Sequence, residues 1–205
     1  MDPSLDELSA LARRLANASR RAILGITGTP GAGKSTLAHS IVAAMGEAAR
    51  LVGMDGFHLA KVELDRLGRQ ERKGAPDTFD GYGYVALLRR LRDNTEPVVY
   101  APMFDRSIEE PIAGAVPVEH NVPLVVTEGN YLLVDEGPWS AVRPLLDACW
   151  YVEAHEPTRI AQLVARHEQF GRTPVAARAH ALGSDQRNAE LIAATRRRAD
   201  LVVTR

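Results

Sequence analysis

The segment from Gly28 to Thr36 has the residue types and spacing of a phosphate-binding loop. Two glycines, Gly28 and Gly33, stand five positions apart and are followed by lysine and serine. Such glycines let backbone N–H groups turn inward around an anion, and the positive end of a following helix strengthens the site. In this P-loop pattern the lysine reaches the β- and γ-phosphates, and the serine hydroxyl binds Mg²⁺. We expect nucleotide to be bound by Gly28, Thr29, Pro30, Gly31, Ala32, Gly33, Lys34, Ser35 and Thr36.

Two acidic residues follow apolar segments that read as strands. Asp55 comes directly after residues 50–54, and Glu128 comes directly after residues 122–127, the most apolar of these segments. Acidic residues at the carboxyl ends of strands in an open α/β sheet face the ligand crevice. We therefore expect Glu128 to bind Mg²⁺ together with Ser35, and Asp55 to act as a general base facing the γ-phosphate. The structural alternative for each carboxylate is the capping of a strand end.

The elements that must position these residues alternate between strands and helices. Short apolar runs predict strands over 22–26, 50–54, 122–127, 149–152 and 201–203. Helical spacing predicts helices over 4–18, from about 34 to 45, around 85–91, and over 138–146, 157–170 and 185–198. This alternation predicts an α/β protein with a parallel core sheet.

Three further segments have recognisable patterns. Residues 1–20 contain an amphipathic helix with a capping box formed by Ser4 and Glu7, which we expect to pack on the domain; a docking surface for a partner is the alternative. Residues 58–84 are polar and glycine-rich, and long segments of this kind are usually functional or disordered. The proline-flanked strands 98–100 and 116–118 indicate a sheet edge or a small hairpin over the core.

The composition is that of an ordinary globular domain. The chain has 205 residues, enough for one domain covering 1–205, and a net charge of −1, which gives no electrostatic case for nucleic acid binding. Its single cysteine, Cys149, cannot form an internal disulfide. No apolar run approaches the roughly 20 residues of a membrane span, so we expect a cytoplasmic protein without a membrane partner. No stretch is a recognisable interface, which leaves the oligomeric state open.

Four segments resemble those of one group of P-loop kinases, the group that contains phosphoribulokinase, uridine kinase and bacterial pantothenate kinase. The resemblance extends from Ile23 to Val203 and is strongest to bacterial proteins described as nucleoside or nucleotide kinase-like, or as fructose-transport-system kinases. The segments are Met54-Asp55-Gly56-Phe57-His58, Lys73 to Asp80, Tyr100 to Arg106, and Thr127-Glu128-Gly129-Asn130.

The resemblance implies a three-layer sandwich with a five-stranded parallel sheet in the order 2-3-1-4-5, helices on both faces, and a small lid at about 157–183. Uridine kinases usually have an Arg-Arg-Asp lid signature, whereas this chain has Arg166-His167-Glu168-Gln169-Phe170-Gly171-Arg172. Both Arg166 and Arg172 are therefore candidates to neutralise the transferring phosphate. The family places substrate contacts in the segment from Tyr100 to Arg106. We expect the acceptor to lie at Asp55 and to be held by hydrogen bonds from candidates His58, Tyr100, Asp105 and Arg106, for each of which a structural or solvated role is the alternative.

Together these features predict an ATP- and Mg²⁺-dependent kinase in which Lys34, Asp55 and the lid arginines are catalytic. Its acceptor would be a hydroxyl of a small polar metabolite, such as fructose, a nucleoside or a pantothenate-like compound. An NTPase switch or metallochaperone-type GTPase is an alternative, but neither Lys61 nor Lys73 stands in the Asn-Lys-x-Asp pattern of guanine specificity. An inert nucleotide-binding module is a third alternative, disfavoured because Lys34, Ser35, Asp55 and Glu128 are all present.

Overall fold

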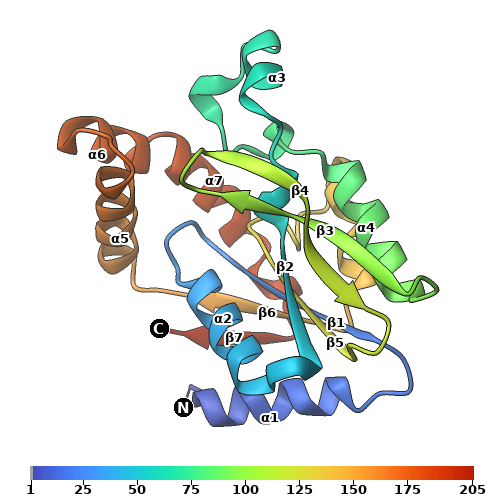
Figure 1. Ribbon diagram of the computed structural model, residues 1–205. Coiled ribbons are helices and arrows are strands. Elements are labelled where there is room, and N and C mark those ends of the chain that lie inside the picture. Colours follow the sequence, from blue (N-terminus) through green and yellow to red (C-terminus); the bar gives the residue numbers. More distant parts are fainter. Residues whose placement is uncertain (1) are drawn as a thin grey trace.

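A five-stranded parallel sheet forms the centre of the computed structural model, which describes residues 2–205 (Figure 1). In spatial order its strands are β2 (Ala49–Gly53), β5 (Leu124–Glu128), β1 (Ala22–Gly28), β6 (Ala148–Glu153) and β7 (Leu201–Thr204). When only these strands are numbered along the chain, the order is 2-3-1-4-5, which confirms the expected fold. Every residue of β1 is buried, and strands covered on both faces are apolar throughout rather than alternating.

Helices cover both faces of the sheet and make three layers. On one face α1 (Leu5–Ala16) and α2 (Lys34–Met45) contribute Leu8, Leu37 and Ile41 to a core with the sheet. On the other face α4 (Gly81–Asp93) and α7 (Ser184–Ala193) contribute residues such as Leu88 and Ile192 to a second core.

The N-terminal helix has the predicted capping box. The Ser4 hydroxyl accepts a hydrogen bond of 3.2 Å from the Glu7 amide, and the Glu7 carboxylate accepts one of 2.7 Å from the Ser4 amide. Leu8 and Ala12 are buried in the core beside α2. The helix therefore packs on the domain, as its apolar face predicted.

A two-stranded hairpin lies against the carboxyl end of β2 (Figure 1). It pairs β3 (Val98–Asp105) with β4 (Glu110–Glu119), so both strands are longer than predicted. Both strands contain prolines. Each strand of a two-stranded sheet has one edge without a partner strand, and a proline whose missing N–H group would point to that edge removes no hydrogen bond between the strands. Close approach to the turn after β2 requires glycine at position 56, since a Cβ atom there would lie 2.6 Å from the Pro102 carbonyl oxygen.

The connection from residue 58 to 84 contains a short helix, α3 (Lys61–Arg66), and two 3-10 turns before α4 begins at Gly81. Its middle is fixed by the carbonyl of Gly74, which accepts hydrogen bonds from the Tyr131 hydroxyl and, at 3.3 Å, from the Asn188 amide. These bonds connect the segment to residues that precede β6 and to α7.

Several predicted helices need correction. Residues 138–146 form two 3-10 turns instead of a helix, because Pro144 lacks the N–H group that an α-helix needs there. The region expected to form the lid contains α5 (Glu156–Gln169) and an unpredicted helix, α6 (Pro174–Leu182), which begins with the Thr173 cap and a proline. The last helix, α7, starts at Ser184 and ends at Ala193, whereas the sequence predicted that it would extend to residue 198.

Within residues 2–205, no helix has the length and apolar character needed to cross a bilayer.

Candidate functional site

The P-loop joins β1 to α2 and is packed against the first turns of α5. Gly31 has a φ of +83°, and a Cβ atom there would lie 2.8 Å from both Leu163 Cγ and the Arg159 carbonyl oxygen. Lys34, in the first turn of α2, is 8% exposed, and its ammonium donates a 3.1 Å hydrogen bond to the Thr29 carbonyl. Burial lowers the pKa of Lys34 to about 8, while the nearby Glu128 carboxylate opposes this shift.

The predicted acidic residues lie at the same edge of the sheet as the P-loop. Glu128 is level with Ile26 on β1 and Gly53 on β2, and Asp55 follows two residues beyond Gly53. Burial raises the pKa of Glu128, and the neighbouring Asp55 raises it further, whereas Lys34 and the Ser35 hydroxyl oppose the change. A buried carboxylate whose pKa is raised in this way by a second carboxylate favours a cation beside it.

Two cavities meet at this edge. The larger, of about 300 Å³, is lined by Asp55, His58 and Glu128 among others. The smaller, of about 280 Å³, lies along the P-loop and α2, beside Gly33 and Thr36. The residues common to both cavities are Lys34, Ser35, Arg106 and Arg166.

Arg106 connects the hairpin, the predicted base and the lid. Its guanidinium donates a 3.0 Å hydrogen bond to the Asp55 carboxylate. The same group lies over two aromatic rings, 5.5 Å from the centroid of Phe104 on β3 and 5.8 Å from that of Phe170 at the end of α5. Arg106 is therefore at the junction of the two cavities with its charge directed at Asp55.

His58 forms part of the wall beside Asp55. Its Nδ1 atom is 2.8 Å from the Asp55 carbonyl oxygen, and its ring lies 4.0 Å from the centroid of Phe79 and 4.8 Å from that of Phe104. Burial lowers the pKa of His58, although the Asp55 charge opposes this. The ring is thus held in a mainly aromatic environment that favours its neutral form.

Two predicted substrate contacts do not line the cavity. Tyr100 is 58% exposed, because its strand neighbours Val99 and Ala101 are the residues that point into the core. Asp105 accepts hydrogen bonds from the amide and hydroxyl of Ser107, 2.8 and 2.7 Å away. Strand alternation directs Phe104 and Asp105 to opposite faces, and only Phe104 lines the cavity.

Both lid arginines lie at the site, but in different places. Arg166 borders the two cavities, whereas Arg172 borders only the larger one. Arg166 is consequently the better placed of the two to contact a phosphoryl group located between the P-loop and Asp55.

Two cationic residues to which the sequence assigned no individual role lie beside the site, and one of them, Lys73, belongs to a segment that the resemblance had singled out. Lys73 donates a 2.7 Å hydrogen bond to the Glu109 carbonyl and lies 4.9 Å from the centroid of the Phe104 ring. Arg159, 1% exposed, donates a 3.1 Å hydrogen bond to the Pro30 carbonyl and so attaches α5 to the P-loop. No local pattern marks Arg159 as a buried residue, since an arginine in a polar helix usually faces solvent.

The comparisons with known proteins agree on one family. Residues 23–205 match the model of the phosphoribulokinase/uridine kinase family. A provisionally named uridine kinase of Schizosaccharomyces pombe is 35% identical over 80% of this chain and 74% of its own length. The uncharacterized protein YggC of Escherichia coli is 32% identical over 98% of this chain and 84% of its own. A crystal structure from Silicibacter, provisionally described as a fructose transport system kinase, superposes with a TM-score of 0.88 at 37% identity and covers 98% of both chains.

Proposed function

The chain belongs to the phosphoribulokinase/uridine kinase family of ATP-dependent phosphotransferases, and from this premise we propose that it transfers the γ-phosphoryl group of ATP to a hydroxyl of a small polar metabolite. The observation that supports this most directly is the pair of cavities joined at Lys34, Ser35, Arg106 and Arg166. One cavity follows the P-loop and suits the phosphates of a nucleotide. The other extends past Asp55 and gives an acceptor a place opposite the γ-phosphate.

The P-loop half of the site would hold the nucleotide. Backbone N–H groups of the loop and the start of α2 offer an anion site, and Lys34 adds a positive charge beside it. The Ser35 hydroxyl and the Glu128 carboxylate fit a magnesium ion, which prefers oxygen ligands and would neutralise phosphate charge when bound. The raised pKa of Glu128 next to Asp55 is consistent with a site that gains from a cation.

Asp55 would receive the proton during transfer. As the acceptor oxygen forms its bond to the γ-phosphorus, the bond from that phosphorus to the bridging oxygen of the β-phosphate breaks, and ADP leaves. The hydroxyl proton moves to the Asp55 carboxylate, which Arg106 orients through its 3.0 Å contact. Arg166 would stabilise the negative charge on the transferring group from the opposite side.

The larger cavity favours a compact acceptor. Its volume of about 300 Å³ is at the small end of ligand sites, and its wall combines aromatic rings with polar groups such as His58 and Lys73. Fructose, a nucleoside or a pantothenate-like compound satisfies these requirements, and the description of the similar Silicibacter protein favours testing sugars first. An NTPase switch would have no need for this second cavity.

The proposal is tested by measuring ADP formation with fructose, ribose, uridine and pantothenate in turn, with ³¹P NMR to identify the phosphorylated product. We expect one acceptor class to raise ADP formation well above the rate without acceptor, and the Asp55→Asn variant to lose that increase. Equal ADP formation with and without every acceptor would favour the NTPase switch. Nucleotide binding without any ADP formation would favour an inert module.

A further inference from the structure

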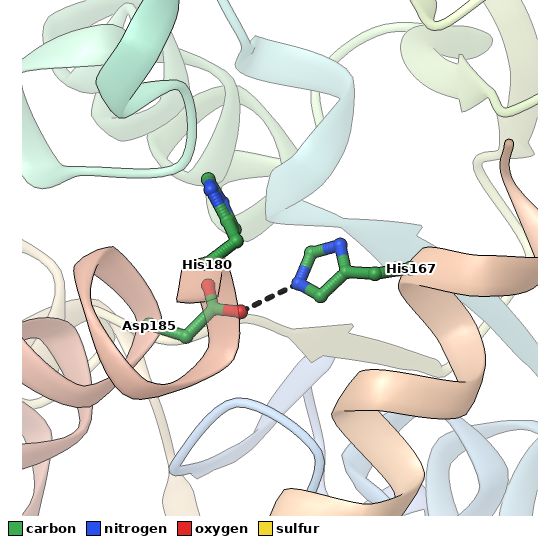
Figure 2. Close-up of side chains that lie close together, drawn as sticks. All are labelled: His167, His180 and Asp185. Carbon is green, nitrogen blue, oxygen red and sulfur yellow. Dashed lines mark hydrogen bonds and ion pairs between the residues drawn. The ribbon is translucent and has the colours of Figure 1, made fainter. Parts of the chain in front are cut away.

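Three side chains of types that bind metal ions lie together where α5, α6 and α7 meet. His167 comes from α5, His180 from α6 and Asp185 from α7 (Figure 2). One ligand atom from each side chain lies within 4.8 Å of the other two. In the part of the chain that the structure describes, no other three histidine, cysteine or acidic side chains meet this criterion.

Helix packing holds the cluster together. The Nε2 atom of His167 is 2.7 Å from the Asp185 carboxylate, and the centroids of the His167 and His180 rings are 4.8 Å apart (Figure 2). The His167 and Asp185 side chains are only 16% and 13% exposed. The residues thus form a partly enclosed group in which α5, α6 and α7 each supply one side chain.

We propose that His167, His180 and Asp185 bind a Zn²⁺ ion. Two imidazole nitrogens and one carboxylate oxygen are a common ligand set for zinc, whereas Mg²⁺ and Ca²⁺ prefer oxygen alone. With bonds of about 2.0–2.2 Å, neighbouring ligand atoms of a tetrahedral zinc ion lie about 3.3 Å apart. The His167 Nε2 and Asp185 carboxylate atoms are 2.7 Å apart, and all three ligand atoms lie within 4.8 Å of one another, so side-chain rotations would bring them onto one ion.

The position of the cluster gives the ion a defined role. Three protein ligands leave the fourth coordination position of zinc open. All three residues line the larger cavity together with Asp55, so that position is accessible to water or to an oxygen of the acceptor. The ion would also cross-link α5, α6 and α7, and would restrict the motion of Arg166 and Arg172, which lie on either side of His167 in the sequence. Zinc binding by these residues is independent of the proposed reaction.

The test uses the complete chain in the presence of excess Mg²⁺, which occupies oxygen-rich sites such as that of Ser35 and Glu128. Titration with Zn²⁺ in a calorimeter should give one site per chain, and Zn²⁺ should raise the thermal unfolding midpoint because it binds the folded state. Co²⁺ in place of Zn²⁺ should give the visible absorption bands of a four-coordinate ion. Absence of zinc binding under these conditions would overturn the proposal.

Two variants assign the binding to the cluster. His180→Gln and Asp185→Asn should each weaken zinc affinity by more than about 100-fold, since even the loss of an outer-shell partner costs about 10–100-fold. His120→Gln, which removes an exposed imidazole directly after the end of β4, should bind as the wild type does. Asp185→Asn keeps the shape and a hydrogen-bonding oxygen beside His167, so it decides the question if His180→Gln fails to fold. Unchanged affinity in a folded Asp185→Asn variant would show that zinc binds elsewhere.

Discussion

The guanidinium of Arg106 lies 3.0 Å from the carboxylate of Asp55, although the two residues are 51 positions apart. The pair joins the hairpin to the turn after β2 at the point where the two cavities meet. Both side chains keep partial exposure, 42% and 32%, and such ion pairs add little to stability. The pair is therefore better explained by orientation of the Asp55 carboxylate than by a contribution to folding.

Arg106→Gln should consequently lower kcat/KM for the acceptor by about tenfold or more, since a charge-assisted hydrogen bond contributes about 1.5–3 kcal/mol and each 1.4 kcal/mol is about tenfold. The free energy of unfolding should change by less than about 1 kcal/mol. Arg187→Gln, on the exposed side of α7, is the matched control. Steady-state kinetics and urea unfolding measure the two effects, and a loss of stability without a loss of kcat/KM would contradict this assignment.

Substitution of the two carboxylates should separate their roles. Asp55→Asn should lower kcat by about 10²–10⁴-fold at saturating Mg²⁺, because a general base contributes that much, and should leave ATP affinity nearly unchanged. Glu128→Gln should instead raise the Mg²⁺ concentration needed for half-maximal rate, by about tenfold or more. Kinetics at varied Mg²⁺ measure both quantities. An equal change in Mg²⁺ response for Asp55→Asn would make Asp55 a metal ligand.

Lys34→Ala should lower turnover by at least about 100-fold, because removal of one preorganised charge from a phosphoryl-transfer site costs about that much. The fold should be retained, since the Lys34 ammonium ends at the Thr29 carbonyl and not in the apolar core. ADP formation and far-UV circular dichroism test the two statements. Lys61→Ala, on α3, serves as the control, and turnover near the wild-type rate in Lys34→Ala would refute the nucleotide-binding assignment.

His58 should make the protein less stable at acidic pH. Burial lowers the pKa of His58 in the folded state. At pH values between this lowered pKa and the ordinary histidine pKa of about 6.5, the imidazole of His58 is protonated in the unfolded chain but not in the folded protein. Protonation there favours unfolding by about 1.4 kcal/mol for each pH unit of that interval. Stability lost between pH 7.5 and 5.5, measured with urea, should be smaller in His58→Gln than in the wild type. The exposed His120→Gln variant should lose as much as the wild type.

Ser4→Ala should lower the free energy of unfolding by about 1 kcal/mol, the usual contribution of an N-cap side chain. The reason is the pair of reciprocal hydrogen bonds between Ser4 and Glu7 at the start of α1. Ser19→Ala changes an exposed serine just beyond this helix and should have almost no effect. Equal stabilities of the two variants in urea would show that the cap contributes nothing.

Local patterns predicted the sheet and the P-loop well, because both depend on short segments. The buried strand before Gly28 and the apolar strand before Glu128 need no distant partner to be recognised. The helix predicted over 138–146 is absent. The prediction rested on the apolar pattern of the segment and took no account of Pro144, which an α-helix interior does not accommodate. Tyr100 and Asp105 do not line the larger cavity, because a resemblance gives the segment, while the direction of each side chain depends on strand pairing.

The lid was the least predictable part. The contact between Arg159 and the Pro30 carbonyl depends on how α5 is placed against the P-loop, which no local pattern encodes. The same holds for His167, His180 and Asp185, which are 13 and 5 positions apart in the sequence and become neighbours only when three helices pack.

The buried contact of Arg159 with the P-loop also determines how the lid can move. It fixes the first turn of α5, so the rest of the helix can tilt as a rigid body about a pivot beside the P-loop. The helix has 14 residues and is about 21 Å long. With the pivot at Arg159, a tilt of about 10° would displace Phe170 by about 3 Å and Arg166 by about 2 Å. A small adjustment at the P-loop would thus become a large change in the width of the acceptor entrance.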